Sequence, residues 1–340
     1  MKNTVRLVAA ALVGVLLLSA TSCADDKKVL DSSKVEQTTV MSVAGHDVPL
    51  EIYRYIALNY KNIYENGKAA DIWLGDSGTA LMNELAEDVR ESVINLYATV
   101  VMCETYGIDA DDSYITDSLE VVMDAVYEEY EYDYKTYAEA IAQQHMNDGV
   151  YRFVVRNELL AEELLHEMVE RGEIPSDEAE FRAVFESDDF IRVKQILISN
   201  ENGRSDEECL ALANDILDRV NAGEDFDTLV QQCGEDLFMF NNDNGYYFAR
   251  GHLDTSFEDA AFELAVGEVS GIVETSAGYS IIKRYEKDAD YIDRSFDELC
   301  DEYVDGRYNL ALEAFAETLT VTETDELKNY SIFSLADTEK

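Results

Sequence analysis

The chain has 340 residues, of which 47% are hydrophobic, and its 72 acidic and 26 basic side chains give a formal net charge of −46. This charge argues strongly against a nucleic-acid partner, because phosphate backbones are bound by lysine and arginine, and it also disfavours adhesion to anionic lipid. The length allows two compact domains or three small ones, and the hydrophobic fraction is sufficient for buried cores.

The N-terminus has the pattern of a secretory signal. Lys2 and Arg6 precede the apolar run "LVAAALVGVLLL", which is followed by the small residues "SATSC". A membrane-spanning helix needs about 20 apolar residues, so this shorter run predicts a signal peptide over residues 1–22.

Cys23 follows Ala20, Thr21 and Ser22, a segment that resembles the lipobox of bacterial lipoproteins, although leucine is commoner than alanine at its first position. The resemblance implies that Cys23 is lipidated and becomes the mature N-terminus. The expected location is then the extracytoplasmic face of a bacterial cell membrane, with residues 23–36 as lipid anchor and tether. An ordinary cleaved signal with an incidental cysteine is the alternative.

Four further cysteines, Cys103, Cys209, Cys233 and Cys300, are widely spaced and form no C-x-x-C pair. Zinc is therefore unsupported, and no metal site is predicted. Export permits disulfides, but Cys103 and Cys209 lie on apolar faces of predicted helices, where buried free thiols are usual. No disulfide is predicted.

Helical periodicity dominates the first half of the chain. A short strand, a turn at Gly45–His46–Asp47 and a helix opening near Pro49 come first. Apolar residues at three- and four-residue steps then predict further helices. These are residues 77–107, 113–131, 134–147 and 150–171. Pro175 marks the end of this block.

From residue 190 the pattern changes to mixed α and β. "FIRVKQILIS" has the alternation of apolar and polar residues that is typical of a strand. Ser205 is the expected cap of a long helix, and a turn at Ala222–Gly223 leads from this helix into a short second one. "NGYYF" is a short strand, and the segment from Ser256 reads helix, strand, strand. The order β-α-α-β-α-β-β covers residues 191–287, and a final helix is expected around residues 295–319.

Several short segments of residues 191–287 resemble, in the same order, the motifs of parvulin-type (PpiC or rotamase) peptidyl-prolyl cis-trans isomerases. They are "VKQILI", "AGEDFDTLV", "GED", "NGYYFARGHL", "SFEDAAFEL", "VGEVSGIVET" and "GYSIIK". Together with the signal, the helical region and the last helix, the chain resembles PrsA-like extracytoplasmic foldases, which are related to SurA-type chaperones.

The resemblance implies an α+β protein. Residues 37–189 would be a helical chaperone-like domain, completed by a C-terminal helix and tail in residues 289–340. Residues 190–288 would be a parvulin domain with a four-stranded, mostly antiparallel sheet, inserted between them.

The resemblance also implies site residues. Leu253, Phe257 and Phe248 correspond to the apolar niche for the proline ring, Asp236 to the group beside the isomerising carbonyl, and Thr275 to a polar network beneath it. Plain core packing is the alternative for Leu253 and Phe257, and a helix-end or loop carboxylate is the alternative for Asp236.

Two positions depart from the family pattern. Active parvulins usually carry one histidine in the first strand and another in the last, where this chain has Gln195 and Ser280. Both replacements can donate and accept hydrogen bonds, so the floor of the pocket need not hold unsatisfied groups. His252 lies near the predicted pocket but does not restore the pair, and a solvated loop residue is the simpler reading.

Two functions remain open. One is a lipid-anchored foldase that assists exported, partly folded polypeptides by isomerising their Xaa-Pro bonds; the other is a holdase whose parvulin domain only binds clients. Isomerase activity itself is uncertain because both histidines are replaced. No cofactor is implied, no protease or hydrolase motif is visible, and a homodimer is left open.

Tyrosines are concentrated in two predicted helical segments, and one hypothesis is that they form a surface that binds unfolded client polypeptides. One group is Tyr53, Tyr55, Tyr60 and Tyr64, and the other is Tyr127, Tyr130, Tyr132, Tyr134 and Tyr137. The favoured alternative is packing between helices, because tyrosine supplies apolar area with a polar tip.

Overall fold

The computed structural model describes residues 38–66, 68, 71–200 and 203–337. The signal peptide, the lipidation of Cys23 and the tether of residues 23–36, which the sequence predicts, all fall outside these ranges. The chain forms two compact units, one of residues up to Met168 together with those from Ala311, and one of Val169–Leu310. Within the described ranges, every helix is too short or too polar to cross a bilayer.

The first unit is mainly helical and carries a small antiparallel sheet of strand order β2-β1-β7. Its first elements are β1 (Thr39–Val43), β2 (His46–Pro49), α2 (Leu50–Glu65), α3 (Gly75–Tyr106), α4 (Ser113–Glu129), α5 (Tyr134–Ala142) and α6 (Asp148–Glu170). Its last are β7 (Val321–Glu323), the 3-10 helix η4 (Leu327–Asn329) and α14 (Ile332–Asp337). The sequence predicted one strand here; β2 and β7 were missed because each is only three or four residues long.

The core of this unit joins segments from both ends of the chain. Val89 and Val93 of α3 are buried in one cluster with Ile52 of α2, and Leu335 of the C-terminal α14 belongs to the same cluster. Arg54 Nε also donates to the carbonyl oxygen of Leu335 at 2.8 Å. The C-terminal residues are therefore part of this core.

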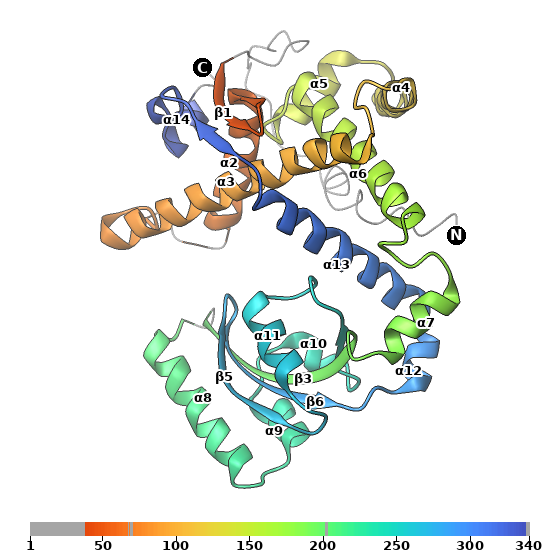
Figure 1. Cartoon of the computed structure of the whole chain (residues 1–340). Coiled ribbons are helices and arrows are strands. Elements are labelled where there is room, and N and C mark those ends of the chain that lie inside the picture. The colour runs from red at the N-terminus through yellow and green to blue at the C-terminus, as the bar shows by residue number, and fades with distance from the viewer. Residues whose placement is uncertain (1–37, 67, 69–70, 201–202, 338–340) are drawn as a thin grey trace. The chain divides into compact units, whose positions relative to one another are not determined.

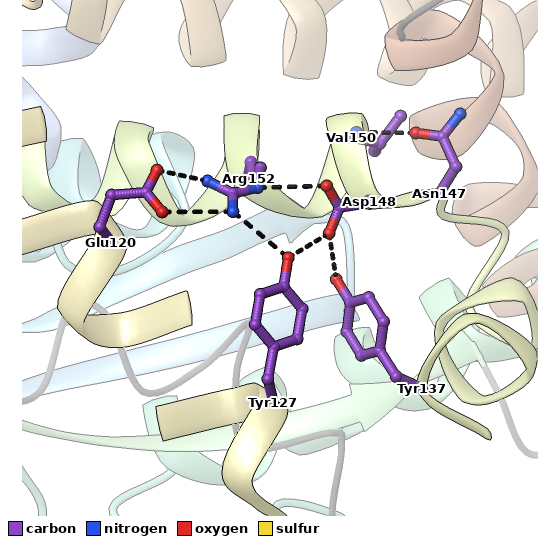
Figure 2. Close-up of polar contacts among 7 residues, drawn as sticks. All are labelled: Glu120, Tyr127, Tyr137, Asn147, Asp148, Val150 and Arg152. Carbon is purple, nitrogen blue, oxygen red and sulfur yellow. Dashed lines mark hydrogen bonds and ion pairs between the residues drawn. The ribbon is translucent and has the colours of Figure 1, made fainter. Parts of the chain in front are cut away.

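Most of the tyrosines pack inside the first unit. Tyr127 and Tyr137 both donate to Asp148 Oδ1, at 2.7 and 3.0 Å, and Arg152 Nε donates to Asp148 Oδ2 at 3.1 Å (Figure 2). Glu120 accepts from Arg152 Nη1 at 2.7 Å and completes the network. Burial, followed by Asp148, raises the pKa of Tyr137. These residues serve packing, and only Tyr132 and Tyr134 of this group have largely exposed rings.

We expect Glu158 of α6 to make the stability of this unit depend on pH. One of its carboxylate oxygens, Oε1, is buried with no hydrogen-bond partner among the described residues. Burial, followed by the neighbouring Glu162, raises the pKa of Glu158 to about 7 from the usual 4.5. The unfolded chain therefore loses this proton at lower pH than the folded chain, so stability falls as pH rises from about 4.5 to about 7.

We expect Glu158→Gln to stabilise the first unit by about 1 kcal/mol at about pH 8, since partial exposure reduces the full linkage value, and by much less at about pH 5. Urea unfolding followed by fluorescence of Trp73, the chain's one tryptophan and a buried member of this unit's core, measures the difference. Glu91→Gln, an exposed change on α3, is the control. A gain that is equal at both pH values would contradict the assignment.

The second unit contains a four-stranded antiparallel sheet of order β4-β3-β6-β5 (Figure 1). Its elements are α7 (Glu178–Glu186), β3 (Ile191–Ser199), α8 (Asp206–Asn221), α9 (Phe226–Cys233), α10 (Leu237–Asn241), β4 (Tyr246–Phe248), α11 (Thr255–Glu263), β5 (Val269–Thr275), β6 (Gly278–Tyr285), α12 (Ala289–Arg294) and α13 (Phe296–Ala316). This confirms the predicted α+β class and four-stranded sheet. Helices α7, α10 and α12 were not predicted.

Helices cover the two faces of this sheet separately (Figure 1). Alternation along β3 sends Ile196 and Ile198 to the face covered by α8 and α9. The opposite face carries Ile191 and Val193 against α11. Because side chains alternate with period two, Gln195 continues the α11 face.

The unit extends beyond the residues 190–288 expected from the sequence. The rings of Phe185 of α7 and Phe190 are in contact, with centroids 4.5 Å apart and planes tilted by 39°, and both belong to a buried cluster with Tyr247 of β4 and Leu299 of α13. Apolar packing therefore attaches α7, α12 and the first part of α13 to the sheet, and the boundary between the units falls within α13.

The four cysteines of the described ranges are free thiols, and three of them, Cys103, Cys209 and Cys300, are buried. The expectation of buried thiols at Cys103 and Cys209 is confirmed. Burial raises the pKa of Cys103 and of Cys300 to about 12, so both stay protonated at neutral pH.

Candidate functional site

Gln195 and Ser280 meet on the α11 face of the sheet. β3 and β6 pair with Gln195 opposite Ile282 and Leu197 opposite Ser280, so the two polar residues are diagonal neighbours on one face. The Ser280 hydroxyl donates to Gln195 Oε1 at 2.7 Å. Ser280 is only 1% exposed, so this bond satisfies its buried hydroxyl.

The chain of hydrogen bonds continues to Asp236. Gln195 Nε2 donates to Asp236 Oδ2 at 2.8 Å. Asp236 also caps the short helix α10, since Phe238 N donates to its Oδ1 at 2.9 Å. The helix-end alternative for Asp236 is therefore correct as a description of its local role, and the cap holds the carboxylate beside the sheet.

Tyr246 joins this polar chain and was missed in the sequence. Its hydroxyl donates to Asp236 Oδ2 at 2.8 Å, and burial, followed by that hydrogen bond, raises the pKa of Tyr246. The alternation in "NGYYF" was the available signal, because it places Tyr246 on the same face as Phe248.

Tyr246 also links the polar chain to an apolar wall. Its ring stacks on Phe238 with centroids 4.6 Å apart, and it meets Phe257 edge-on at 6.5 Å. Phe257 in turn lies 6.1 Å from Phe248. Leu253 packs against the same cluster, so the three predicted niche residues lie together, with Phe248 and Phe257 buried and Leu253 half-buried.

Glu258 holds the loop that carries Leu253. This carboxylate is 4% exposed, and its Oε1 accepts from the backbone N–H groups of Gly251, His252 and Leu253 at 2.8–3.0 Å. Gly251 has φ +94°, and a Cβ there would lie 2.5 Å from the carbonyl oxygen of Gly306. Only glycine therefore fits this turn, and Glu258 satisfies the donors that the turn buries.

Two residues that the sequence analysis placed at or near the site, Thr275 and His252, take no part in the hydrogen bonds around Asp236. Thr275 donates to the carbonyl oxygen of Gly278 at 3.2 Å, across the β5–β6 turn, and no bond links it to Gln195, Asp236 or Ser280 among the described residues. His252 is exposed, in keeping with a solvated loop residue.

The arrangement combines a carboxylate acceptor with aromatic and aliphatic walls. Asp236 is held by donors on both oxygens, so its position is defined without a covalent partner or a metal. Within the described ranges no group of histidine, cysteine, aspartate and glutamate side chains is placed to bind a metal ion.

Comparison with known proteins shows which part of the chain is similar to a known family and which relatives it has. Residues 181–288 match the family described as "PPIC-type PPIASE domain". "Foldase protein PrsA" of Geobacillus kaustophilus is 28% identical over 223 residues, which are 65% of this chain and 69% of that protein. "Foldase protein PrsA" of Caldanaerobacter subterraneus subsp. tengcongensis is 27% identical over 272 residues, 78% of each protein.

Among solved structures, that of a peptidylprolyl isomerase (PrsA) from Bacillus anthracis is 19% identical, with a TM-score of 0.37, and the match covers 68% of this chain and all of that one. The family match and the two relatives confirm the parvulin-type, PrsA-like resemblance seen in the sequence.

Proposed function

We propose that this protein assists the folding of exported proteins by isomerising their Xaa-Pro bonds. The match of residues 181–288 to the PpiC-type family and the similarity of the chain to PrsA foldases support this proposal. The proposal depends on one observation: Tyr246 donates a hydrogen bond to Asp236, and its ring contacts Phe257, which packs against Phe248. Anchoring to the outer face of the cell membrane through Cys23 is part of the proposal.

The reaction is a rotation about an amide bond. Its barrier is about 20 kcal/mol, because twisting destroys the resonance that places partial double-bond character in the C–N bond. No covalent intermediate is required. A site that lowers this barrier by about 4 kcal/mol accelerates the rotation roughly a thousandfold.

Each part of the site has a role in this scheme. Phe248, Phe257 and Leu253 enclose the proline ring and exclude water from the adjoining carbonyl. Asp236 places negative charge beside that carbonyl, where the planar amide carries negative charge on its oxygen. Since the twisted amide carries less, the carboxylate destabilises the planar state more than the transition state.

Gln195, Ser280 and Tyr246 orient Asp236. Gln195 receives the Ser280 hydrogen bond on its oxygen, which fixes its amide so that the nitrogen faces Asp236. The two residues that replace the family's histidines thus form, with Asp236, one continuous chain of hydrogen bonds. Thr275 retains only a local role in the β-turn, and we propose no catalytic part for it.

The alternative is a holdase that grips unfolded segments without isomerising them. The feature that favours it is the loss of both imidazoles, since an amide and a hydroxyl give the floor of the site a different shape. Unfolded exported polypeptides are the partner in either case.

An isomerase assay on a soluble form that begins after Cys23 tests the proposal. We expect faster cis-to-trans conversion of a short Xaa-Pro peptide than in buffer, and a further gain in the double variant Gln195→His/Ser280→His. Suppression of client aggregation without any acceleration would reject the isomerase and leave the holdase.

A further inference from the structure

A cavity of about 300 Å³ lies in the second unit and shares no residue with the proposed proline site. Ala249 and Arg250 line it from the end of β4, Phe262 from α11, and three residues from α13. The α13 residues are Tyr303, Arg307 and Leu310, and Asp189 completes the lining. Its volume is at the lower end of the range for small-ligand sites.

The two arginines of the cavity differ in their bonding. Arg250 pairs with Asp259 at 2.6 Å and lies over the ring of Phe262, with its guanidinium carbon 4.6 Å from the centroid. Arg307 is half-buried, and its guanidinium makes no hydrogen bond or ion pair with the residues of the described ranges. A guanidinium has five N–H donors and no acceptor, so Arg307 is able to bind an anion in this cavity.

The hydroxyl of Tyr303 is a second free donor on the same wall. Its ring packs edge-on against Phe181 and Phe185, which fixes its position, and its hydroxyl has no hydrogen bond within the part of the chain that the structure describes. Burial is the main cause of a raised pKa of Tyr303, so the hydroxyl is protonated and available to donate.

We propose that this cavity binds a carboxylate carried on an apolar body. The planar guanidinium of Arg307 matches the two oxygens of a carboxylate, Tyr303 supplies a further donor, and Ala249, Phe262 and Leu310 enclose the apolar part. Arg307 and Asp189 bring opposite charges to the lining, so the single negative charge of a carboxylate is repelled less there than the double charge of a phosphate.

Such a carboxylate has two sources, the C-terminal residue of a polypeptide or a free small organic acid. Both present the same group to Arg307, and the test separates them. The proposal does not depend on isomerase activity, because none of the cavity residues belongs to the proposed proline site.

The test measures binding to the soluble full chain by titration calorimetry. The probes are N-acetylphenylalanine and the peptide Ala-Ala-Ala-Phe, each compared with its C-terminal amide. We expect the acids to bind at least about tenfold more tightly than the amides, and Arg307→Gln to remove most of that preference. Arg294→Gln, an exposed change on α12, is the matched control and is expected to leave binding unchanged.

The two probes assign the source. Binding of the peptide acid identifies a polypeptide C-terminus, and binding of N-acetylphenylalanine alone identifies a small acid. Arg307→Lys, which keeps the charge and loses the planar fork, is expected to bind with intermediate affinity, and its thermal unfolding checks that the fold is intact. Equal binding of acids and amides, no binding of either acid, or full binding by Arg307→Gln would overturn the proposal.

Discussion

Replacement of Glu258 by alanine is expected to destabilise the second unit by about 3 kcal/mol. The carboxylate accepts from three consecutive backbone N–H groups, at Gly251, His252 and Leu253. Each donor that is left buried without a partner costs roughly 1–3 kcal/mol, and entry of water into the loop offsets part of the sum. No apolar side chain can replace these bonds.

The matched variant Glu258→Gln retains one acceptor oxygen and is expected to cost about 1 kcal/mol, because it weakens the bonds without removing all of them. Glu263→Ala, an exposed change at the end of the same helix, serves as the control. Both units contribute to circular dichroism, whereas Trp73 fluorescence reports the first unit alone. In urea unfolding of Glu258→Ala, the transition followed by circular dichroism should therefore shift, and the transition followed by Trp73 fluorescence should not.

An unshifted dichroism transition for Glu258→Ala would mean that the loop is not held by this carboxylate. A shift in Trp73 fluorescence of the same size would mean that the two units unfold as one cooperative body. Since Glu258 positions Leu253, we also expect Glu258→Gln to raise KM for a proline peptide more than it lowers kcat.

Asp236→Ala is expected to lower kcat/KM for isomerisation by about 10- to 100-fold. The carboxylate is the acceptor for both Gln195 Nε2 and the Tyr246 hydroxyl, and hydrogen bonds to a charged group contribute about 1.5–3 kcal/mol each. Its removal takes the negative charge from beside the carbonyl and releases both neighbours. The loss of the α10 cap adds a stability cost of about 1 kcal/mol, which is too small to unfold the unit.

The variant Tyr246→Phe distinguishes the effect of orienting the Asp236 carboxylate from the effect of its charge. It removes one hydrogen bond to Asp236 and keeps the ring that stacks on Phe238, so a loss of about three- to tenfold is expected. Asp243→Ala, an exposed carboxylate in the loop before β4, controls for the general effect of losing one charge. Unchanged kcat/KM in Asp236→Ala would remove the carboxylate from the mechanism, and an equal loss in Asp243→Ala would make the effect one of net charge.

Much of the second unit was predictable because its signals are local. The alternation of "FIRVKQILIS" specified β3, and Ser205 begins α8 with a capping box in which Glu208 is the partner three residues on. Helix periodicity gave the long helices of the first unit within a few residues. Very short elements were missed, as at α10, because five residues carry too little periodic signal.

The site network could not be predicted in the same way. Gln195 meets Asp236 across 41 positions of sequence and Ser280 across 85, and both contacts depend on the register of β3 and β6 and on the loop before α10. Tyr246 and Glu258 were overlooked for this reason, since neither is distinguished from its neighbours until the strands are paired.

By itself the sequence determined the order of elements, the α+β class and the replacement of two histidines by Gln195 and Ser280, because these follow from local periodicity and residue identity. Only the tertiary structure decided that these two residues join Asp236 in one chain of hydrogen bonds, and that Arg307 lines a cavity without an acidic partner among the described residues. The physical reason is that hydrogen bonds and charge compensation act over a few ångströms in space. Chain segments far apart in sequence must therefore be packed together before their partners are defined.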